Sequence, residues 1–201
     1  MATREHYKDL ESLVVERWKR PNALLLKAFF SAFSSPISVS KGDILLDLND
    51  ESYGLYFVLE GVVIEFGQDE TGALIIPQVF QKAGLILNSN LINPGASAKT
   101  RYKTASPVTY IRVDQSVIES FKNRDGFGEL FFTLQQIFLH QARAHFIHLL
   151  HFNPIEHIAW IHANQPLIYT TLTKIQLAAF LGVSRATLFR VLGAFKASKV
   201  H

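Results

Sequence analysis

The sequence has no cysteine in its 201 residues. This absence excludes disulfides, thiol nucleophiles, and zinc or iron–sulfur centres held by the chain's own thiolates. No apolar run approaches the roughly 20 residues that cross a bilayer, and the first residues lack the apolar segment of a secretory signal. These absences predict a soluble, cytoplasmic protein without a membrane partner.

Motifs that carry common chemistry are also missing. The sequence contains no nucleophile elbow, no P-loop, no zinc-binding motif and no dinucleotide fingerprint. We therefore expect that the protein is not an enzyme and that it holds no resident cofactor or metal. At 201 residues, of which 48% are hydrophobic, the chain can bury a core in one domain or two small ones.

Acidic residues are absent from the last part of the chain. Glu156 is the last of them, and the five charged residues between His157 and His201 are all basic. The segment carries a formal charge of +5, whereas the rest of the chain carries −2. A segment with charge of one sign only is suited to a polyanion such as nucleic acid.

Residues 173–192 of this basic segment predict two short helices joined by a tight turn. Thr173 can cap the first helix, and Gln176, three residues later, completes a capping box. Gly182 can end that helix because glycine readily adopts a positive φ. Ser184 can cap the second helix, and the spacing is that of a helix-turn-helix.

The second helix has basic and short polar side chains near its N-terminal end. In a recognition helix this end reaches base edges and phosphates in the major groove. Arg185 is placed for a bidentate contact to guanine, and Arg190 can reach a phosphate or another base. The predicted DNA-binding residues are Arg185, Thr187 and Arg190, with Ser184 as the cap and Thr173 and Lys174 as phosphate contacts. The alternative is an ordinary helical hairpin with a solvated face.

The run LGVSRATLFR, residues 181–190, resembles the turn and recognition helix of the Crp/Fnr family of bacterial transcription regulators. Many members have Glu after the first recognition Arg, whereas this chain has Ala186. A Glu can accept a hydrogen bond from cytosine and an Ala cannot. The resemblance therefore implies DNA binding with a target sequence that differs from that of those members.

The first part of the chain predicts helices and then an antiparallel β-structure. Helical spacing runs from residue 3 to about 33, with a break at Pro21. Residues 36–113 contain short β-prone runs between turn residues, which is typical of an antiparallel barrel or jelly roll. The pieces KGDIL at 41–45 and YFVLEGVVI at 56–64 resemble the cyclic-nucleotide-binding fold of the same family, so the resemblance covers about residues 20–197.

The resemblance implies an effector pocket but not its usual ligand. In cyclic-nucleotide binders of this fold a short helix and loop hold the phosphate with an Arg, and a Glu holds the ribose hydroxyl. Aligned on Gly84 and on residues 103–105, this chain has Leu85 and Ala96 in those two places. Loss of the charge-assisted pair argues against cyclic AMP, and the expected effector is an unknown small molecule. The candidate pocket residues are Leu85, Ala96, Ser97, Lys99 and Arg101. Lys99 and Arg101 either bind an anion other than cyclic AMP or are solvated loop charges. The pocket itself is then either empty or filled by its own side chains.

A long helix is predicted from about residue 129 to residue 151, with apolar residues on more than one face. One face can meet the β-structure. A 3–4 spacing predicts a coiled-coil seam formed by Phe131, Leu134, Phe138, Gln141, His145 and His148. The resemblance implies that this helix pairs with its copy in a homodimer, which would place two recognition helices about 34 Å apart on a palindromic site.

The same helix carries a histidine cluster, formed by His140, His145, His148 and His151. Residues three apart share a helix face, and imidazole is a common metal ligand. A metal or haem site is one interpretation, although no carboxylate lies near in sequence before Glu156. A partly polar dimer seam or domain junction is another, and a pH-sensitive interface is a third.

Asn153-Pro154 ends the long helix, because the residue before a proline avoids the α region. We predict a boundary here between a sensor domain at 1–152 and a DNA-binding domain at 153–201. Residues 155–163 predict a short helix, and 167–171 predict an extended lead into the helix-turn-helix. Residues 193–201 are too few for a β-hairpin wing, so the expectation is a truncated chain or a wingless branch of the family.

These observations predict an α+β protein. It combines an N-terminal antiparallel barrel or jelly roll of the cyclic-nucleotide-binding type, a long dimerisation helix and an all-α helix-turn-helix domain. The predicted function is a homodimeric, sequence-specific regulator of transcription that binds double-stranded DNA. The alternative is a ligand-binding regulatory module that docks on a protein partner, and the acid-free C-terminal segment argues against it.

Overall fold

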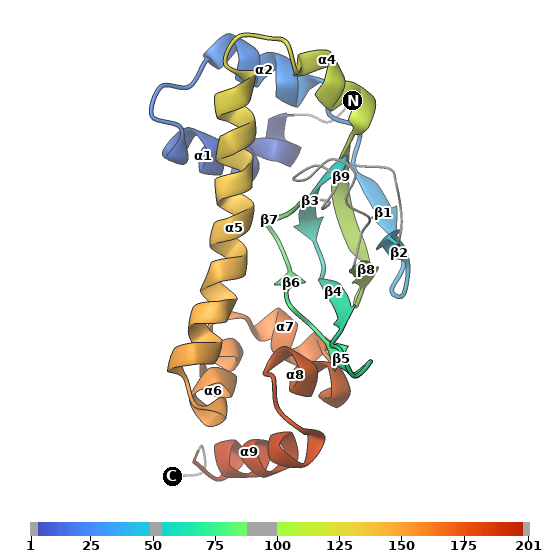
Figure 1. Ribbon diagram of the computed structural model, residues 1–201, viewed down its shortest axis with the longest axis vertical. Helices are drawn as coiled ribbons and strands as arrows, with labels where there is room; N and C mark the ends of the chain where they lie inside the picture. The colour runs from blue at the N-terminus through green and yellow to red at the C-terminus, as the bar shows by residue number, and fades with distance from the viewer. Residues whose placement is uncertain (1–3, 49–53, 88–99, 199–201) are drawn as a thin grey trace.

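Helices at both ends of the chain flank an antiparallel β-domain (Figure 1). The computed structural model describes residues 4–48, 54–87 and 100–198. Two N-terminal helices, α1 (Arg4–Arg17) and α2 (Ala23–Ser31), lie on either side of Pro21, as predicted. Asn22 caps α2, because its side-chain oxygen accepts a hydrogen bond from the backbone N–H of Leu25 at 3.0 Å.

The β-domain contains short strands whose described pairings are all antiparallel. The strands are β1 (Ile37–Val39), β2 (Ile44–Leu46), β3 (Gly54–Glu60), β4 (Val63–Gln68), β5 (Leu74–Ile75), β6 (Val79–Phe80), β7 (Gly84–Leu87), β8 (Arg101–Thr104) and β9 (Val108–Asp114). One sheet has the order β1-β9-β3-β7, and the other has the order β2-β8-β4-β5, with β6 also paired to β4. The predicted α+β class and antiparallel strands are confirmed.

A glycine turn connects β3 to β4. Gly61 has a φ of +89°, and a Cβ atom built on it would lie 2.2 Å from the carbonyl oxygen of Pro107. Only glycine combines this backbone conformation with the space available. The turn therefore fixes how the strand leaves one sheet and enters the other.

The C-terminal half is helical. The elements are α4 (Gln115–Phe121), α5 (Phe127–His151), α6 (Pro154–Asn164), α7 (Pro166–Thr171), α8 (Lys174–Phe180) and α9 (Arg185–Ser198). Helix α5 extends along much of the molecule, from the N-terminal helices to α6 (Figure 1). At the break after α5, Asn153 and Glu156 form a capping box at the start of α6, which agrees with the predicted end of the long helix.

Two sequence-based expectations were incomplete or wrong. Strand β7 has no counterpart among the predicted β-prone runs, because its four residues are all buried and lack the alternation that marks a half-exposed strand. Residues 167–171 form helix α7 and not an extended lead. Pro166 stands in the first turn of α7, where a fixed φ and a missing N–H favour a helix start.

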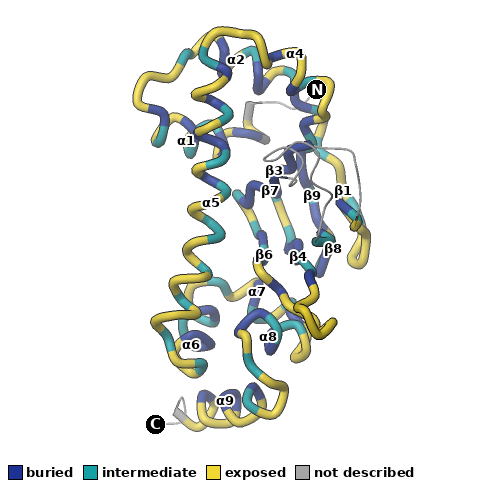
Figure 2. The backbone as a smooth tube through the Cα atoms, viewed as in Figure 1, coloured by how far each residue is buried: buried dark blue, intermediate teal, exposed yellow. Residues whose placement is uncertain are grey.

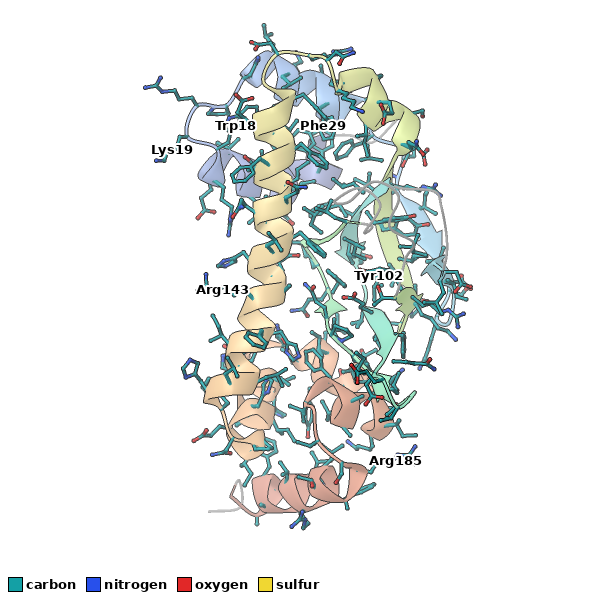
Figure 3. The ribbon with its side chains drawn as sticks, viewed as in Figure 1. Trp18, Lys19, Phe29, Tyr102, Arg143 and Arg185 are labelled. Atoms are coloured by element: carbon teal, nitrogen blue, oxygen red, sulfur yellow. The ribbon has the colours of Figure 1, made fainter. Side chains whose placement is uncertain are left out.

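The buried residues (dark blue in Figure 2) form three hydrophobic clusters, one of which lies within the β-domain and includes Tyr56, Val63 and Tyr102. The other two also contain residues of the helices. The first joins α1, α2 and α5 to the β1-β9-β3-β7 sheet and is rich in aromatic rings, among them Phe29 (Figure 3). The second, here called the shared cluster, contains residues from the β-domain and from the C-terminal helices. Its members include Val62, Ile64, Ile76 and Ala105 from the former and Ile158, Leu177 and Leu188 from the latter. The β-domain and the C-terminal helices therefore share one core.

The predicted seam of α5 packs within the chain itself. Leu134 is 1% exposed, and Phe131 and Phe138 pack against the first cluster. The Gln141 side chain donates to the carbonyl oxygen of Ala83 and accepts from the N–H of Leu85. The seam prediction was therefore wrong about the face, because periodicity finds an apolar stripe but does not say which stripe meets the β-domain.

A second stripe of α5 is exposed. Phe132, Leu139 and Phe146 recur every seven residues and are 59%, 53% and 58% exposed. Leu150, at the same side after a further four residues, is 65% exposed. Heptad spacing of large apolar residues is typical of a helix that packs on another helix.

No single helix among the described residues is long and apolar enough to span a membrane. Helices α8 and α9 satisfy the length and composition only as a pair, and they meet at an angle of 97°.

Candidate nucleic-acid interface

Helices α8 and α9 form the motif that the sequence predicts. Thr173 and Gln176 make the capping box at the start of α8, and Gly182 ends the turn with a φ of +64°. The axes of α8 and α9 meet at 97°, within the roughly 90–120° of a helix-turn-helix. The backbone geometry therefore supports the prediction of two helices and a tight turn.

The inner side of this motif is apolar. Leu177 and Ala178 of α8 and Leu188 of α9 are at most 3% exposed and belong to the shared cluster. Small Ala178 allows the two helices to approach closely, as expected. The packing fixes which side of α9 is turned outward.

Polar and basic side chains lie on the outer side of α9. Arg185 and Arg190 are exposed, and Figure 3 shows Arg185 projecting from the N-terminal end of the helix at the edge of the molecule. Phe189 lies between them in sequence and is 61% exposed. An exposed aromatic ring at this position can contact a thymine methyl group.

Three of the predicted DNA-binding residues are joined by hydrogen bonds. Ser184 Oγ accepts from the N–H of Thr187 at 3.1 Å, and the two hydroxyl oxygens are 2.9 Å apart. Arg190 Nη2 donates to Thr187 Oγ1 at 3.3 Å. The side chain of Arg185 has no hydrogen bond or ion pair with any residue that the structure describes. Its guanidinium is therefore available to a ligand, whereas Thr187 and Arg190 are already oriented.

Thr173 and Lys174 lie at the start of α8 and are both exposed. Lys174 Nζ is 5.9 Å from the ring centre of Tyr169 and has no acidic neighbour in this acid-free segment. Thr173 also borders a cavity of about 870 Å³ between α8 and the end of the β-domain at β4, β5 and β8. Both positions remain candidate phosphate contacts.

The predicted effector residues are not brought together where they are described. Leu85 lies in β7 of one sheet, is fully buried and belongs to the first cluster. Arg101 lies in β8 of the other sheet and donates to Asp47 Oδ1 at 2.6 Å. This hydrogen bond holds the pKa of Asp47 below its usual range, so the charge of Arg101 is already compensated. Ala96, Ser97 and Lys99 lie outside the described residues.

The β-domain holds a polar pair that the sequence did not predict, formed by half-buried Glu65 and buried Tyr102. Glu65 of β4 faces Tyr102 of β8 in the strand register, and hydrogen bonds to Thr100 and Tyr102 reach its carboxyl group. Burial nevertheless raises the pKa of Glu65, and burial together with the carboxyl group raises the pKa of Tyr102. The sequence does contain a signal for this pair, because Glu65 is the single acidic residue in a mostly apolar strand.

The histidines of α5 meet the C-terminal helices. His145 stacks on Phe180 of α8 with ring centres 4.0 Å apart, and His148 contacts the edge of Trp160 at 4.0 Å. His157 of α6 lies 5.6 Å from both imidazoles. Burial lowers the pKa of His145 and of His157 to about 4. The junction interpretation is therefore supported for His145 and His148.

The described residues contain no group of three or more His, Cys, Asp or Glu arranged to hold a metal ion. His157 completes the junction but was not predicted, because Asn153-Pro154 separates it from the others in sequence. Only the fold of the chain at that break brings α6 back against α5.

Comparison with known proteins gives no match of the sequence to a family model or to a curated protein. Solved structures do match. A Crp/Fnr-family transcriptional regulator from Eubacterium rectale has a TM-score of 0.68 at 14% identity, with 92% of this chain and 88% of that chain covered. FixK2 from Bradyrhizobium japonicum has a TM-score of 0.64 at 16% identity, with 82% and 85% covered.

A third similar structure is CLP of Xanthomonas campestris, described as a c-di-GMP-responsive global regulator. Its TM-score is 0.64 at 12% identity, and 89% of this chain and 93% of that chain are covered. The likeness extends over both the β-domain and the C-terminal helices in each case. The chain therefore has the fold of the Crp/Fnr transcriptional regulators.

Proposed function

We propose that the protein is a sequence-specific DNA-binding regulator of transcription of the Crp/Fnr type. The observation that carries the proposal is the outer side of α9, where the exposed Arg185 side chain has no partner among the described residues and lies in an acid-free, basic segment. Positive charge of this kind supplies affinity for the phosphate backbone, and an unengaged guanidinium can read a base edge. A protein with this role is neither an enzyme nor a membrane protein, and it acts in the cytoplasm.

Each predicted contact has a role that follows from its position. Arg185 reads a guanine with two hydrogen bonds, and Phe189 contacts a neighbouring base. Thr187 holds Arg190 toward the DNA, because the two side chains are joined at 3.3 Å. Lys174 and Thr173 contact phosphates at the start of α8, which fixes register without reading sequence.

The protein acts as a homodimer through α5. Its exposed stripe places Phe132, Leu139 and Phe146 at heptad spacing, and such a stripe is stabilised when a second copy covers it. A two-fold pair of α5 helices would carry two recognition helices about one turn of DNA apart. The binding site is then palindromic.

Cyclic AMP is not the effector in this proposal. Leu85 occupies the position of the ribose-binding Glu, and its side chain is fully buried among apolar neighbours. A buried leucine offers no hydrogen bond to a hydroxyl group. The expected position of the phosphate-binding Arg is Ala96, which has no charge to offer.

The test is selection of binding sites from a random duplex pool with the full chain and with Arg185→Ala. The full chain should enrich a palindrome, without cyclic AMP. Arg185→Ala should lose its preference at one symmetric base pair, at a cost of about 1–3 kcal/mol. Lys196→Ala is the matched control, since Lys196 is exposed in the last turn of the same helix. It should weaken binding without a change in base preference.

Two outcomes contradict the proposal. An enriched site with unchanged preferences in Arg185→Ala would show that another residue reads the sequence. No binding to duplex DNA at low salt would favour a module that docks on a protein partner, because affinity for a polyanion is greatest at low salt.

A further inference from the structure

A second cavity, here called the junction cavity, lies where α5 meets the rest of the chain. Its volume is about 340 Å³, which is at the small end of ligand sites. The wall comes from α1, from the segment between β6 and β7, from α5, and from α6 and α8. It is therefore bordered by elements before and after the predicted domain boundary.

Three side chains of the lining each have a nitrogen atom without a hydrogen-bond partner among the described residues. These atoms are Arg17 Nη1, His145 Nε2 and His157 Nε2, and each is shielded from solvent. His157 as a residue is only 2% exposed. Buried polar atoms are nearly always paired, and an unpaired one is costly, so these three atoms indicate a missing partner.

The fixed charges of the lining are all positive. Arg17 and Lys82 line the cavity, and no Asp or Glu does. Glu16 Oε2 is 3.9 Å from Arg17 Nη1, which is too far for a hydrogen bond, and Asp9 pairs with Lys82 at 3.3 Å outside the lining. The lining itself offers no anionic group that hydrogen-bonds to Arg17 Nη1, and a ligand carboxylate would supply one.

The elements that carry these side chains reach the junction cavity from different parts of the molecule. Arg17 belongs to α1, which lies beside the upper half of α5, whereas His157 belongs to α6 at the lower end (Figure 1). The lining residues of α5 run from Ile137 to His148, a span of about 16 Å at the helix rise. Apolar Phe80, Ile137 and Ala144 contribute to the wall. A ligand that reaches from α1 to α6 is long and has an apolar middle.

One wall has an unusual backbone. Ala83 has a φ of 66°, the only non-glycine residue with positive φ among those described, and it lines the cavity next to Lys82. Its carbonyl oxygen accepts a hydrogen bond from Gln141 Nε2 at 3.1 Å. A strained backbone held in place by a neighbouring helix is often found at ligand sites.

We propose that the junction cavity binds an elongated hydroxy carboxylic acid. The carboxylate pairs with Arg17, the apolar chain lies along α5, and the distal hydroxyl group bonds to the imidazoles of His145 and His157. A hydroxyl group suits a neutral imidazole, because it can donate to a bare ring nitrogen or accept from a protonated one. The ligand joins α1 to α6, so it also sets the position of the C-terminal helices; this regulatory effect depends on the proposed DNA-binding function.

The test measures binding calorimetrically with the full chain and three probes: ω-hydroxydecanoate, decanoate and decanol. We expect ω-hydroxydecanoate to bind most tightly, and decanol, which lacks the carboxylate, to bind at least about ten-fold more weakly. Arg17→Met should weaken both acids by about ten-fold or more. Lys19→Met is the matched control, since Lys19 is exposed two residues away and points to solvent (Figure 3). It should leave all affinities unchanged.

The histidine end is tested separately. His157→Leu should reduce the affinity for ω-hydroxydecanoate to that for decanoate, and His157→Gln, which keeps a polar nitrogen near the Nε2 position, should restore part of the difference. Circular dichroism confirms that each variant is folded. No binding of either acid at millimolar concentration, or binding that Arg17→Met leaves unchanged, would overturn the proposal. Binding that has no effect on duplex DNA affinity would support the site and contradict its regulatory role.

Discussion

Acidification should destabilise the junction between α5 and the C-terminal helices. His145 and His157 are neutral at pH 7, because burial lowers the pKa of each from 6.5 to about 4. Their neighbours are aromatic rings and His148, and the cavity beside them is lined by the cations Arg17 and Lys82. No carboxylate lines this cavity to stabilise an added charge.

The sign and size follow from proton linkage. The two imidazoles bind protons near pH 6.5 in the unfolded chain and only near pH 4 in the folded chain. Their contribution to the free energy of unfolding is therefore fully present above pH 6.5 and is lost as the pH falls from 6.5 to about 4. At about pH 4.5, the effect of each imidazole should lower the free energy of unfolding by about 2 kcal/mol, a value that is reduced to allow for the partial exposure of His145. The two together are a large share of the roughly 5–15 kcal/mol that stabilises a typical domain.

Urea unfolding at a series of pH values measures this loss. Other groups also titrate, so the informative quantity is the difference between the full chain and His157→Phe, which keeps a ring of similar size without a proton to bind. Between about pH 7 and about pH 4.5, the free energy of unfolding of the full chain should fall by about 2 kcal/mol more than that of the variant. Equal slopes for the two proteins would refute the reasoning that buried neutral imidazoles control the acid response.

Three further predictions concern the exposed stripe, a turn and a helix cap. Phe146→Glu should convert the proposed homodimer to a monomer in sedimentation experiments, whereas Leu24→Glu, at an 82% exposed position outside α5, should not. Gly61→Ala should lower the free energy of unfolding by more than about 2 kcal/mol, since its Cβ would overlap a backbone oxygen. Gly72→Ala should cost only about 1 kcal/mol, because its positive φ is the sole obstacle. Asn153→Ala should cost about 1 kcal/mol through loss of two capping hydrogen bonds, as measured by thermal unfolding.

Local signals in the sequence predicted the local structure well. The capping residues Thr173 and Ser184 and the positive φ of Gly182 stand where the sequence placed them. Each of these signals depends on a few neighbouring residues and on backbone chemistry, so no tertiary information is needed. The same is true of the helix break at Asn153.

Long-range contacts account for what the sequence could not predict. The stripe of α5 that contains Leu134 and the stripe that contains Phe146 are both apolar, and only the packing of the β-domain decides which one is buried. Likewise, Arg101 is engaged by Asp47, which is far from it in sequence. Effector residues are predicted by alignment with relatives, but their availability depends on such contacts.

The shared cluster has a consequence for how this protein unfolds. Because Val62, just before β4, and Ile64 of β4 pack in the same core as Leu177 and Leu188, residues 153–198 bury part of their apolar surface on the β-domain. A fragment cut at the predicted boundary would expose that surface to water and tend to aggregate. The chain should melt in one cooperative transition, with α9 held at a fixed orientation until the whole molecule unfolds.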